Sequence, residues 1–137
     1  MKPEQITKEG FESQLKVRVT EEMLDSFIIW SGDSAPLHTD EVFARSHGYA
    51  GRIVHGAALF SLVSRFFGMY FPGPNSVLLK SDISFCKPCY APSDLLIKGI
   101  VKHYSEATQT LVINFEVMDS NDETIAFLKG YHKLLVI

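Results

Sequence analysis

The sequence is poor in cysteine, in positive charge and in long hydrophobic runs. Two cysteines are too few for a disulfide-stabilised scaffold. Lys and Arg number 13 against 16 Asp and Glu, a formal net charge of −3 that argues against a nucleic-acid-binding surface. The uncharged stretch between Arg52 and Arg65 holds twelve residues, and the next, which ends at Lys80, contains Pro72 and Pro74. Neither stretch reaches the roughly 18–20 residues of a membrane span.

The N-terminal segment also lacks the apolar core of a secretory signal. We therefore expect a cytoplasmic protein that has no nucleic-acid partner and no membrane partner.

Apolar residues and aromatic rings are plentiful. Hydrophobic residues make up 46% of the 137 residues, and ten Phe, five Tyr and one Trp are enough to build a core. There is no internal repeat, low-complexity stretch or linker. The composition predicts a single domain over residues 1–137.

The first half of the chain is predicted to be mainly helical after an initial strand at 14–20. Thr20 can cap a helix that has two glutamates in its first turn and stops near Gly32. Thr39 can cap a second, short helix that ends near Gly48. A third helix should run from Gly56 to about residue 68, and because it is apolar nearly all round we expect it to be buried on most sides.

The second half is predicted to form strands. Apolar residues alternate over 77–85, and three further β-rich runs follow at 94–104, 109–118 and 123–136, separated by turn-forming residues. A helical first half followed by consecutive strands is typical of an α+β domain. We expect an antiparallel sheet wrapped around the long apolar helix.

The segment 30–40 carries a candidate acid–base pair. Asp33 and His38 are five residues apart, and Gly32 and Pro36 shape the turn between them, so both side chains can face one pocket. A carboxylate beside an imidazole can move protons in both directions near neutral pH. Asp33 can hold or activate a water, and His38 can serve as the matching acid or base.

A second segment, 51–58, leads into the long helix at Gly56. The amide N–H groups at a helix N-terminus have no intrahelical partner and carry partial positive charge. A substrate carbonyl placed there is polarised, which is how an oxyanion hole works. Gly56 also lets a substrate approach the backbone closely.

Together these segments resemble those of the MaoC-like acyl dehydratases, the (R)-specific enoyl-CoA hydratases of the hot-dog fold. The similar motifs are Ser-Gly-Asp-Ser-Ala-Pro-Leu-His-Thr-Asp at 31–40, Gly-Arg-Ile-Val-His-Gly at 51–56, and Phe-Cys-Lys-Pro-Cys-Tyr-Ala-Pro-Ser-Asp at 85–94. The resemblance covers 27–101, and the two motifs in the first half are specific when they occur together.

The resemblance implies hydration of a trans-2-enoyl thioester, or the reverse dehydration. Asp33 and His38 fall on the family's catalytic pair, Gly56 on its carbonyl-binding amide, and Ser64 where a serine supports the pair in some members. It implies a homodimer or a dimer of dimers. It implies no metal and no redox cofactor, with coenzyme A or an acyl carrier arm as part of the substrate.

One residue departs from the family pattern. The family usually has Asn just before the proline, and this chain has Ala35. An amide that could brace the loop is missing, which affects the expected rate and substrate range more than the reaction class. A thioesterase on the same fold and a non-catalytic acyl-thioester-binding protein remain alternatives, because fold does not fix function.

Several of the singled-out residues also have a purely structural interpretation. His55 can simply orient the start of the helix, Ser64 can bond a backbone carbonyl one turn earlier, and Phe67 can be core rather than the floor of an acyl pocket. The spacing of Cys86 and Cys89, with no second pair, does not favour a zinc site. His47, His103 and His132 lack metal-ligand spacing, and Arg45, Arg52, Lys80 and Lys87 are either phosphate-binding cations or solvated surface charges.

Overall fold

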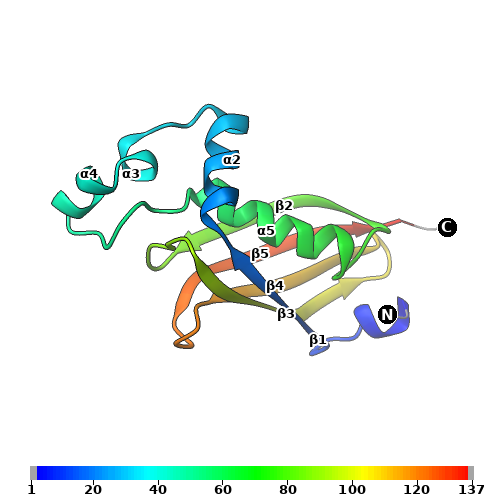
Figure 1. The fold of residues 1–137 in the computed structure, drawn as a ribbon. Coiled ribbons are helices and arrows are strands. Elements are labelled where there is room, and N and C mark those ends of the chain that lie inside the picture. The colour runs from blue at the N-terminus through cyan, green and yellow to red at the C-terminus, as the bar shows by residue number, and fades with distance from the viewer. Residues whose placement is uncertain (1–2, 136–137) are drawn as a thin grey trace.

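The computed structural model describes residues 3–135 and shows one antiparallel sheet with a long helix lying across it (Figure 1). The helix is α5 (Gly56–Met69). The strands are β1 (Glu12–Val19), β2 (Ser76–Phe85), β3 (Ser93–Ser105), β4 (Thr110–Met118) and β5 (Thr124–Leu134), in the order β1-β3-β4-β5-β2. All neighbouring pairs are antiparallel. The predicted α+β architecture and all five strands are confirmed, and residue 136 of the last predicted strand lies outside the described residues.

The core lies between α5 and the sheet. One side of α5 is buried, and β4 points every second residue from Leu111 to Val117 toward it, so the period of two seen in the sequence corresponds to the inner face. The apolar side chains that meet there are Leu59, Leu62, Val63, Phe66 and Phe67 of α5 and Ile97, Val101, Leu111, Ile113, Phe115, Val117 and Leu128 of the sheet. The opposite side of α5, including Ser64 and Met69, is exposed in the single chain, so the helix is less enclosed than its composition predicts.

Helix α2 (Glu21–Ser31) begins and ends where the sequence predicts. The side-chain oxygen of Thr20 accepts a hydrogen bond from the Met23 amide at 3.1 Å, and Gly32 ends the helix in the left-handed conformation with φ of 74°. A Cβ atom makes that conformation costly, which explains the glycine.

Two short helices were not predicted: α1 (Pro3–Ile6) and α3 (Pro36–Thr39). Because Thr39 belongs to α3, the prediction that it caps the next helix is wrong. Its hydroxyl donates to the carbonyls of Ser34 and Ala35, and Asp40 instead caps α4 (Glu41–Ser46) by accepting from the Phe43 amide.

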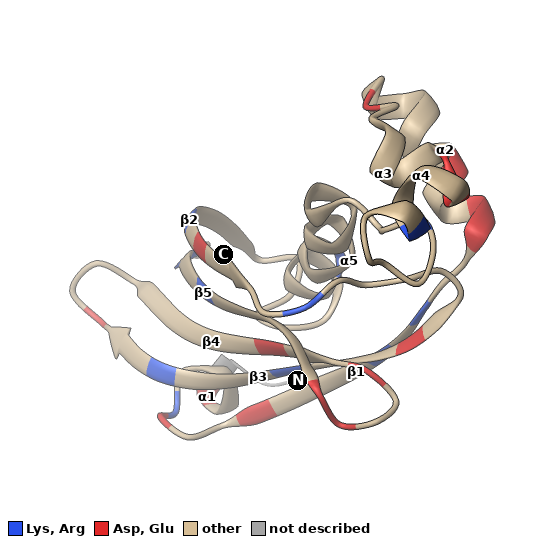
Figure 2. Ribbon diagram, turned by 90° about the vertical axis from the view of Figure 1, so that its left-hand side faces the viewer, with Lys and Arg blue, Asp and Glu red and all other residues tan. Residues whose placement is uncertain are grey.

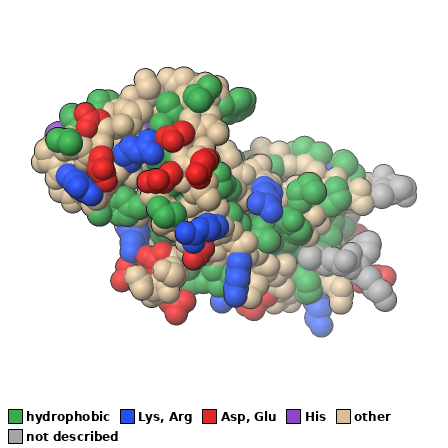
Figure 3. Space-filling model, in the orientation of Figure 1, with side chains coloured by type: hydrophobic (Ala, Val, Ile, Leu, Met, Phe, Trp, Pro, Cys, Tyr) green, Lys and Arg blue, Asp and Glu red, His purple; other side chains and the backbone are tan. Residues whose placement is uncertain are grey.

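Helices α2, α3 and α4, here called the helical arm, rise above the sheet, and α3 and α4 reach beyond one end of it (Figure 1). Figure 2 shows the sheet curving beneath α5, with the arm on the far side of that helix. Acidic and basic side chains are mixed over the surface of the arm (Figure 3). Among residues 3–135, no helix is long and apolar enough to cross a membrane.

Candidate active site

Two chain segments meet beside the start of α5: the loop at 32–38 after α2, and the residues at 53–55 that enter α5. The Ile53 amide donates to the carbonyl of Leu37 at 2.9 Å. The Val54 amide donates to the carbonyl of Cys89 at 2.8 Å, which ties the same segment to the loop after β2. These backbone bonds place the two candidate motifs side by side.

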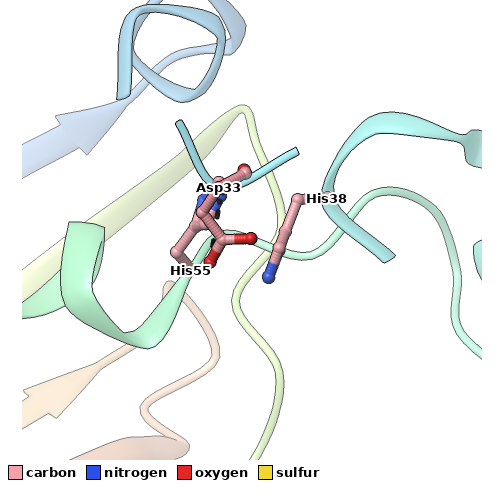
Figure 4. A group of neighbouring side chains, drawn as sticks. All are labelled: Asp33, His38 and His55. Carbon is pink, nitrogen blue, oxygen red and sulfur yellow. Dashed lines mark hydrogen bonds and ion pairs between the residues drawn. The ribbon is translucent and has the colours of Figure 1, made fainter. Parts of the chain in front are cut away.

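The structure brings Asp33 and His38 together and adds His55 to them. One ligand atom from each of the three side chains lies within 4.8 Å of the others. Figure 4 shows a carboxylate oxygen of Asp33 directed toward His38, with His55 beside them. The sequence predicted that Asp33 and His38 face one pocket, and in the structure the two side chains do lie close together.

Backbone carbonyls fix which nitrogen of each imidazole carries hydrogen. His38 Nδ1 lies 2.7 Å from the Ile53 carbonyl oxygen, and since a carbonyl only accepts, Nδ1 carries the hydrogen. In the neutral ring, Nε2 of His38 is therefore the lone-pair nitrogen. His55 is the reverse, because its Nε2 donates to the Asp33 carbonyl at 2.9 Å.

The Asp33 carboxylate is accessible to solvent, with 53% of the side chain exposed. Its Oδ1 accepts from the Ala35 amide at 3.3 Å, and its Oδ2 lies 4.0 Å from His55 Nε2. The second distance is too long for a hydrogen bond, so Oδ2 is free to accept one from a substrate or a water. Ala35 braces this loop through its backbone N–H, a contact that does not need the missing Asn side chain.

Gly56 is the first residue of α5, and His55, at the N-cap position, makes no side-chain capping bond. The first-turn amides thus lack the side-chain partner that often satisfies them. A Cβ atom at Gly56 would lie 2.7 Å from Cζ of Phe85, at the end of β2. Sequence reasoning missed Phe85 as a neighbour of the site, because only the folded chain brings the end of β2 to the start of α5.

Ser64 lies two helical turns beyond Gly56, about 12 Å along the helix axis from the standard rise per residue. Its side chain is exposed. The bond to a backbone carbonyl one turn earlier is made by Ser61, whose hydroxyl donates to Ala57 at 2.9 Å. Support of the catalytic pair by Ser64 stays a prediction.

The three side chains lie close enough together to hold a metal ion, but the orientation of the two rings favours acid–base chemistry. The rings of His38 and His55 stack with centroids 3.7 Å apart and planes 17° apart. Imidazole lone pairs lie in the ring plane, so two stacked rings direct them along near-parallel planes rather than toward one ion. In addition, His55 Nε2 is occupied by the Asp33 carbonyl.

The four cations considered for phosphate binding all have acidic partners. Arg45 pairs with Glu41, Arg52 with Asp25, and Lys80 with Asp82. Lys87 bonds Asp119 at 2.8 Å and also Glu123. Because each cation already has an acidic partner, we interpret the four as surface charges and not as phosphate-binding residues.

Two other singled-out features are accounted for by packing. The Phe67 ring is buried, 4.5 Å from Phe115 and 4.8 Å from His132 between ring centroids. Cys86 is exposed and Cys89 is buried, and burial raises the pKa of the Cys89 thiol to about 11, which keeps it protonated.

Comparison with known proteins defines the class of fold and then the family. The solved (R)-hydratase from A. caviae involved in PHA biosynthesis matches with a TM-score of 0.86 and 25% identity, over 93% of this chain and 96% of that chain. The fold is the hot-dog fold. A family model described as the MaoC like domain matches residues 3–122, so the chain belongs to the MaoC-like family.

Curated relatives match over shorter stretches. The (R)-specific enoyl-CoA hydratase of Aeromonas caviae is 33% identical over 86 residues, 63% of this chain and 64% of the relative. The mitochondrial 3-hydroxyacyl-[acyl-carrier-protein] dehydratase of Arabidopsis thaliana is 35% identical over 72 residues, 53% of this chain and 41% of the relative. The chain thus spans less than two thirds of either relative.

Proposed function

We propose that the protein catalyses the reversible hydration of trans-2-enoyl thioesters to (R)-3-hydroxyacyl thioesters. The observation that carries the proposal is that the Asp33 carboxylate and the His38 ring, whose Nε2 is the lone-pair nitrogen, lie in one cluster with His55, the residue just before α5. The names of the Aeromonas and Arabidopsis relatives, a hydratase and a dehydratase, support the same class of reaction.

The two acceptors divide the work on one water molecule. Oδ2 of Asp33 accepts a hydrogen bond from the water and orients it, while Nε2 of His38 removes its other proton. The water oxygen forms a bond to C3 of the substrate as the C2–C3 double bond opens. The electron pair moves through C2 to the thioester oxygen, giving an enolate.

The Gly56 amide then stabilises the negative charge on the thioester oxygen. The enolate collapses as C2 takes the proton from the His38 imidazolium, which returns the ring to its neutral form. Water is consumed, both side chains are regenerated and no electrons are transferred to or from the protein. Dehydration follows the same steps in reverse.

The substrate partner in this proposal is an acyl thioester of coenzyme A or of an acyl carrier protein, whose arm is part of the substrate rather than a separate cofactor. We favour hydration over thioester hydrolysis because hydration uses both Asp33 and His38, one to orient the water and the other to carry a proton to C2.

The protein partner is a second copy of the chain. β2 lies at an edge of the sheet and exposes Val77 and Leu79. An edge strand with apolar side chains invites pairing with another chain. We expect light scattering to give at least twice the 15.4 kDa of one chain. A mass of one chain would contradict the dimer.

The hydration is tested by the ultraviolet absorbance of crotonyl-CoA, which falls when water adds to the conjugated double bond. We expect the wild type to remove the absorbance, and Asp33→Asn and His38→Gln each to lower kcat by about 10²- to 10⁴-fold, the range for loss of an acid–base group. Glu22→Gln, which removes an exposed carboxylate on α2, is the matched control and should keep wild-type activity.

The product distinguishes the alternatives. Chiral analysis should give the (R)-3-hydroxy thioester. Release of free thiol without loss of the double bond would favour a thioesterase, and tight binding with no turnover of coenzyme A or carrier-linked substrates would favour a binding protein.

A further inference from the structure

His55 occupies an unusual position for a histidine. The side chain is 2% exposed, and its ring contacts two other rings: Phe27 of α2 at 4.8 Å and His38 at 3.7 Å between centroids. The stack with His38 is nearly parallel, at 17°. The face of one imidazole therefore limits how the other can rotate.

His55 also joins the two segments that build the site. Its Nε2 donates to the backbone carbonyl of Asp33, while the Ile53 carbonyl accepts from His38 Nδ1. The Ile53 amide adds a third bond, to Leu37. Of the three, the bond from His55 is the one that holds the peptide of Asp33 itself. Gly56 follows His55 directly, so the same residue sits between the acid–base pair and the start of α5.

The second ring nitrogen of His55 indicates that packing alone does not explain why a histidine occupies this position. Nδ1 of His55 is buried and has no hydrogen-bond partner among the described residues. Leaving a buried polar atom unpaired costs stability. A phenylalanine would fill the same space against Phe27 and His38 without that cost, but it could not donate to Asp33.

We propose that His55 is a positioning residue, which fixes Asp33 through the Nε2 hydrogen bond and His38 through the ring stack, and so holds both at a set distance from the Gly56 amide. The inference rests on the proposed hydration and extends it to a third side chain. His55 transfers no proton in this scheme. Its Nε2 hydrogen is bound to a carbonyl, and its Nδ1 is enclosed.

Two substitutions separate the two contacts. His55→Phe keeps the ring and loses the donor, and His55→Gln keeps a donor at the distance of Nε2 and loses the stack. We expect each to lower kcat for crotonyl-CoA at least tenfold with KM changed less than threefold, because the groups that act on the water are displaced while the acyl-CoA contacts persist. Far-UV circular dichroism and thermal unfolding confirm that the variants are folded at the assay temperature.

His47 provides a matched control. Its ring also contacts a phenylalanine ring, that of Phe43, at 4.2 Å between centroids, and it bonds a backbone carbonyl at 2.8 Å, but it lies at the end of α4 outside the cluster. His47→Phe and His47→Gln should keep wild-type kcat. Wild-type kcat in both His55 variants, or losses no larger than those in the His47 variants, would overturn the proposal.

A spectroscopic measurement tests positioning independently of turnover. At about pH 8.5, where an ordinary imidazole is neutral, the ¹⁵N shifts of His38 should report hydrogen on Nδ1 in the wild type. In His55→Gln they should move toward a mixture of the two tautomers. If the wild type fails to hydrate enoyl thioesters, this measurement still decides the role of His55, and an unchanged His38 spectrum in His55→Gln would overturn it.

Discussion

The ring of Phe85 covers Gly56 so closely that a Cβ atom on the glycine would lie 2.7 Å from the tip of the ring. The contact joins the end of β2 to the first turn of α5, where the substrate carbonyl is proposed to bind. Phe85 is 54% exposed, so its ring can swing away from an intruding methyl group. Adding a single methyl group at Gly56 is therefore expected to displace the Phe85 ring at the site.

We therefore expect Gly56→Ala to affect activity more than stability. The free energy of unfolding should fall by less than about 1 kcal/mol, below the usual cost of overpacking, because a half-exposed ring yields. The hydration rate should fall at least tenfold as the ring and the first-turn amide shift. Urea unfolding and the crotonyl-CoA assay measure the two effects, and a large loss of stability with normal activity would contradict the expectation.

Gly99 on β3 provides the contrasting case. A Cβ atom there would lie 2.8 Å from the Phe115 ring and 2.9 Å from the Phe71 ring, and both rings are buried. Because both rings are packed in the core and not exposed as Phe85 is, Gly99→Ala should lower the free energy of unfolding by about 1–3 kcal/mol. Denaturant unfolding should show Gly99→Ala to be less stable than Gly56→Ala. The reverse order would mean that the core around Phe115 is less tightly packed in solution than in the structure.

His132 on β5 should make the protein less stable in mild acid. It is fully buried, both ring nitrogens lack hydrogen-bond partners among the described residues, and burial lowers its pKa to about 4 from an ordinary 6.5. Between these two values the unfolded chain binds a proton that the folded chain does not. Stability is therefore lost as the pH falls from about 6.5 toward 4, and at pH 5 the loss amounts to about 2 kcal/mol.

His132→Leu should remove this dependence. The leucine packs against Phe67 and Phe115 and leaves no unpaired nitrogen, so at pH 7 the variant should be at least as stable as the wild type. Urea unfolding of both proteins at pH 7 and pH 5 measures how much the free energy of unfolding of each falls with pH. An equal loss of stability in the two proteins would show that other groups account for the acid sensitivity.

Lys87 should control the titration of Asp119. Its ammonium group bonds the Asp119 carboxylate and lowers the pKa of that carboxyl below its ordinary 3.8, with help from the backbone amides of Glu123 and Asn121. In Lys87→Met the pKa of Asp119 should rise toward the ordinary value. A ¹³C titration of the carboxyl group measures this, and no change would mean that the backbone amides alone set the pKa.

The sequence predicted those parts of the fold that depend on local patterns. Thr20 and Gly32 bound α2 as expected because a cap and a left-handed glycine act within one turn of their own helix. Thr39 and Asp40 were harder to separate, since both residue types cap helices and only the extra turn started by Pro36 assigns the cap to Asp40.

The candidate site shows the same division. Asp33 and His38 lie close in sequence and were predicted to meet. The ring stack on His55 and the cover of Phe85 over Gly56 depend on contacts between residues 17 and 29 positions apart, and no local pattern specifies them. Ser64 was assigned to the site by resemblance alone. Its distance from Gly56 is set by the length of α5 between them and not by the 51–56 motif.

The acceptors that orient His38 and His55 are both main-chain carbonyls, those of Ile53 and Asp33. Every amino acid carries such a group. A substitution at position 53 that keeps the backbone path would leave the His38 acceptor in place. The exposed side chains of the helical arm can likewise change without altering which nitrogen holds the hydrogen. Many side chains around this site can therefore be substituted without changing which nitrogen of His38 and His55 carries the hydrogen.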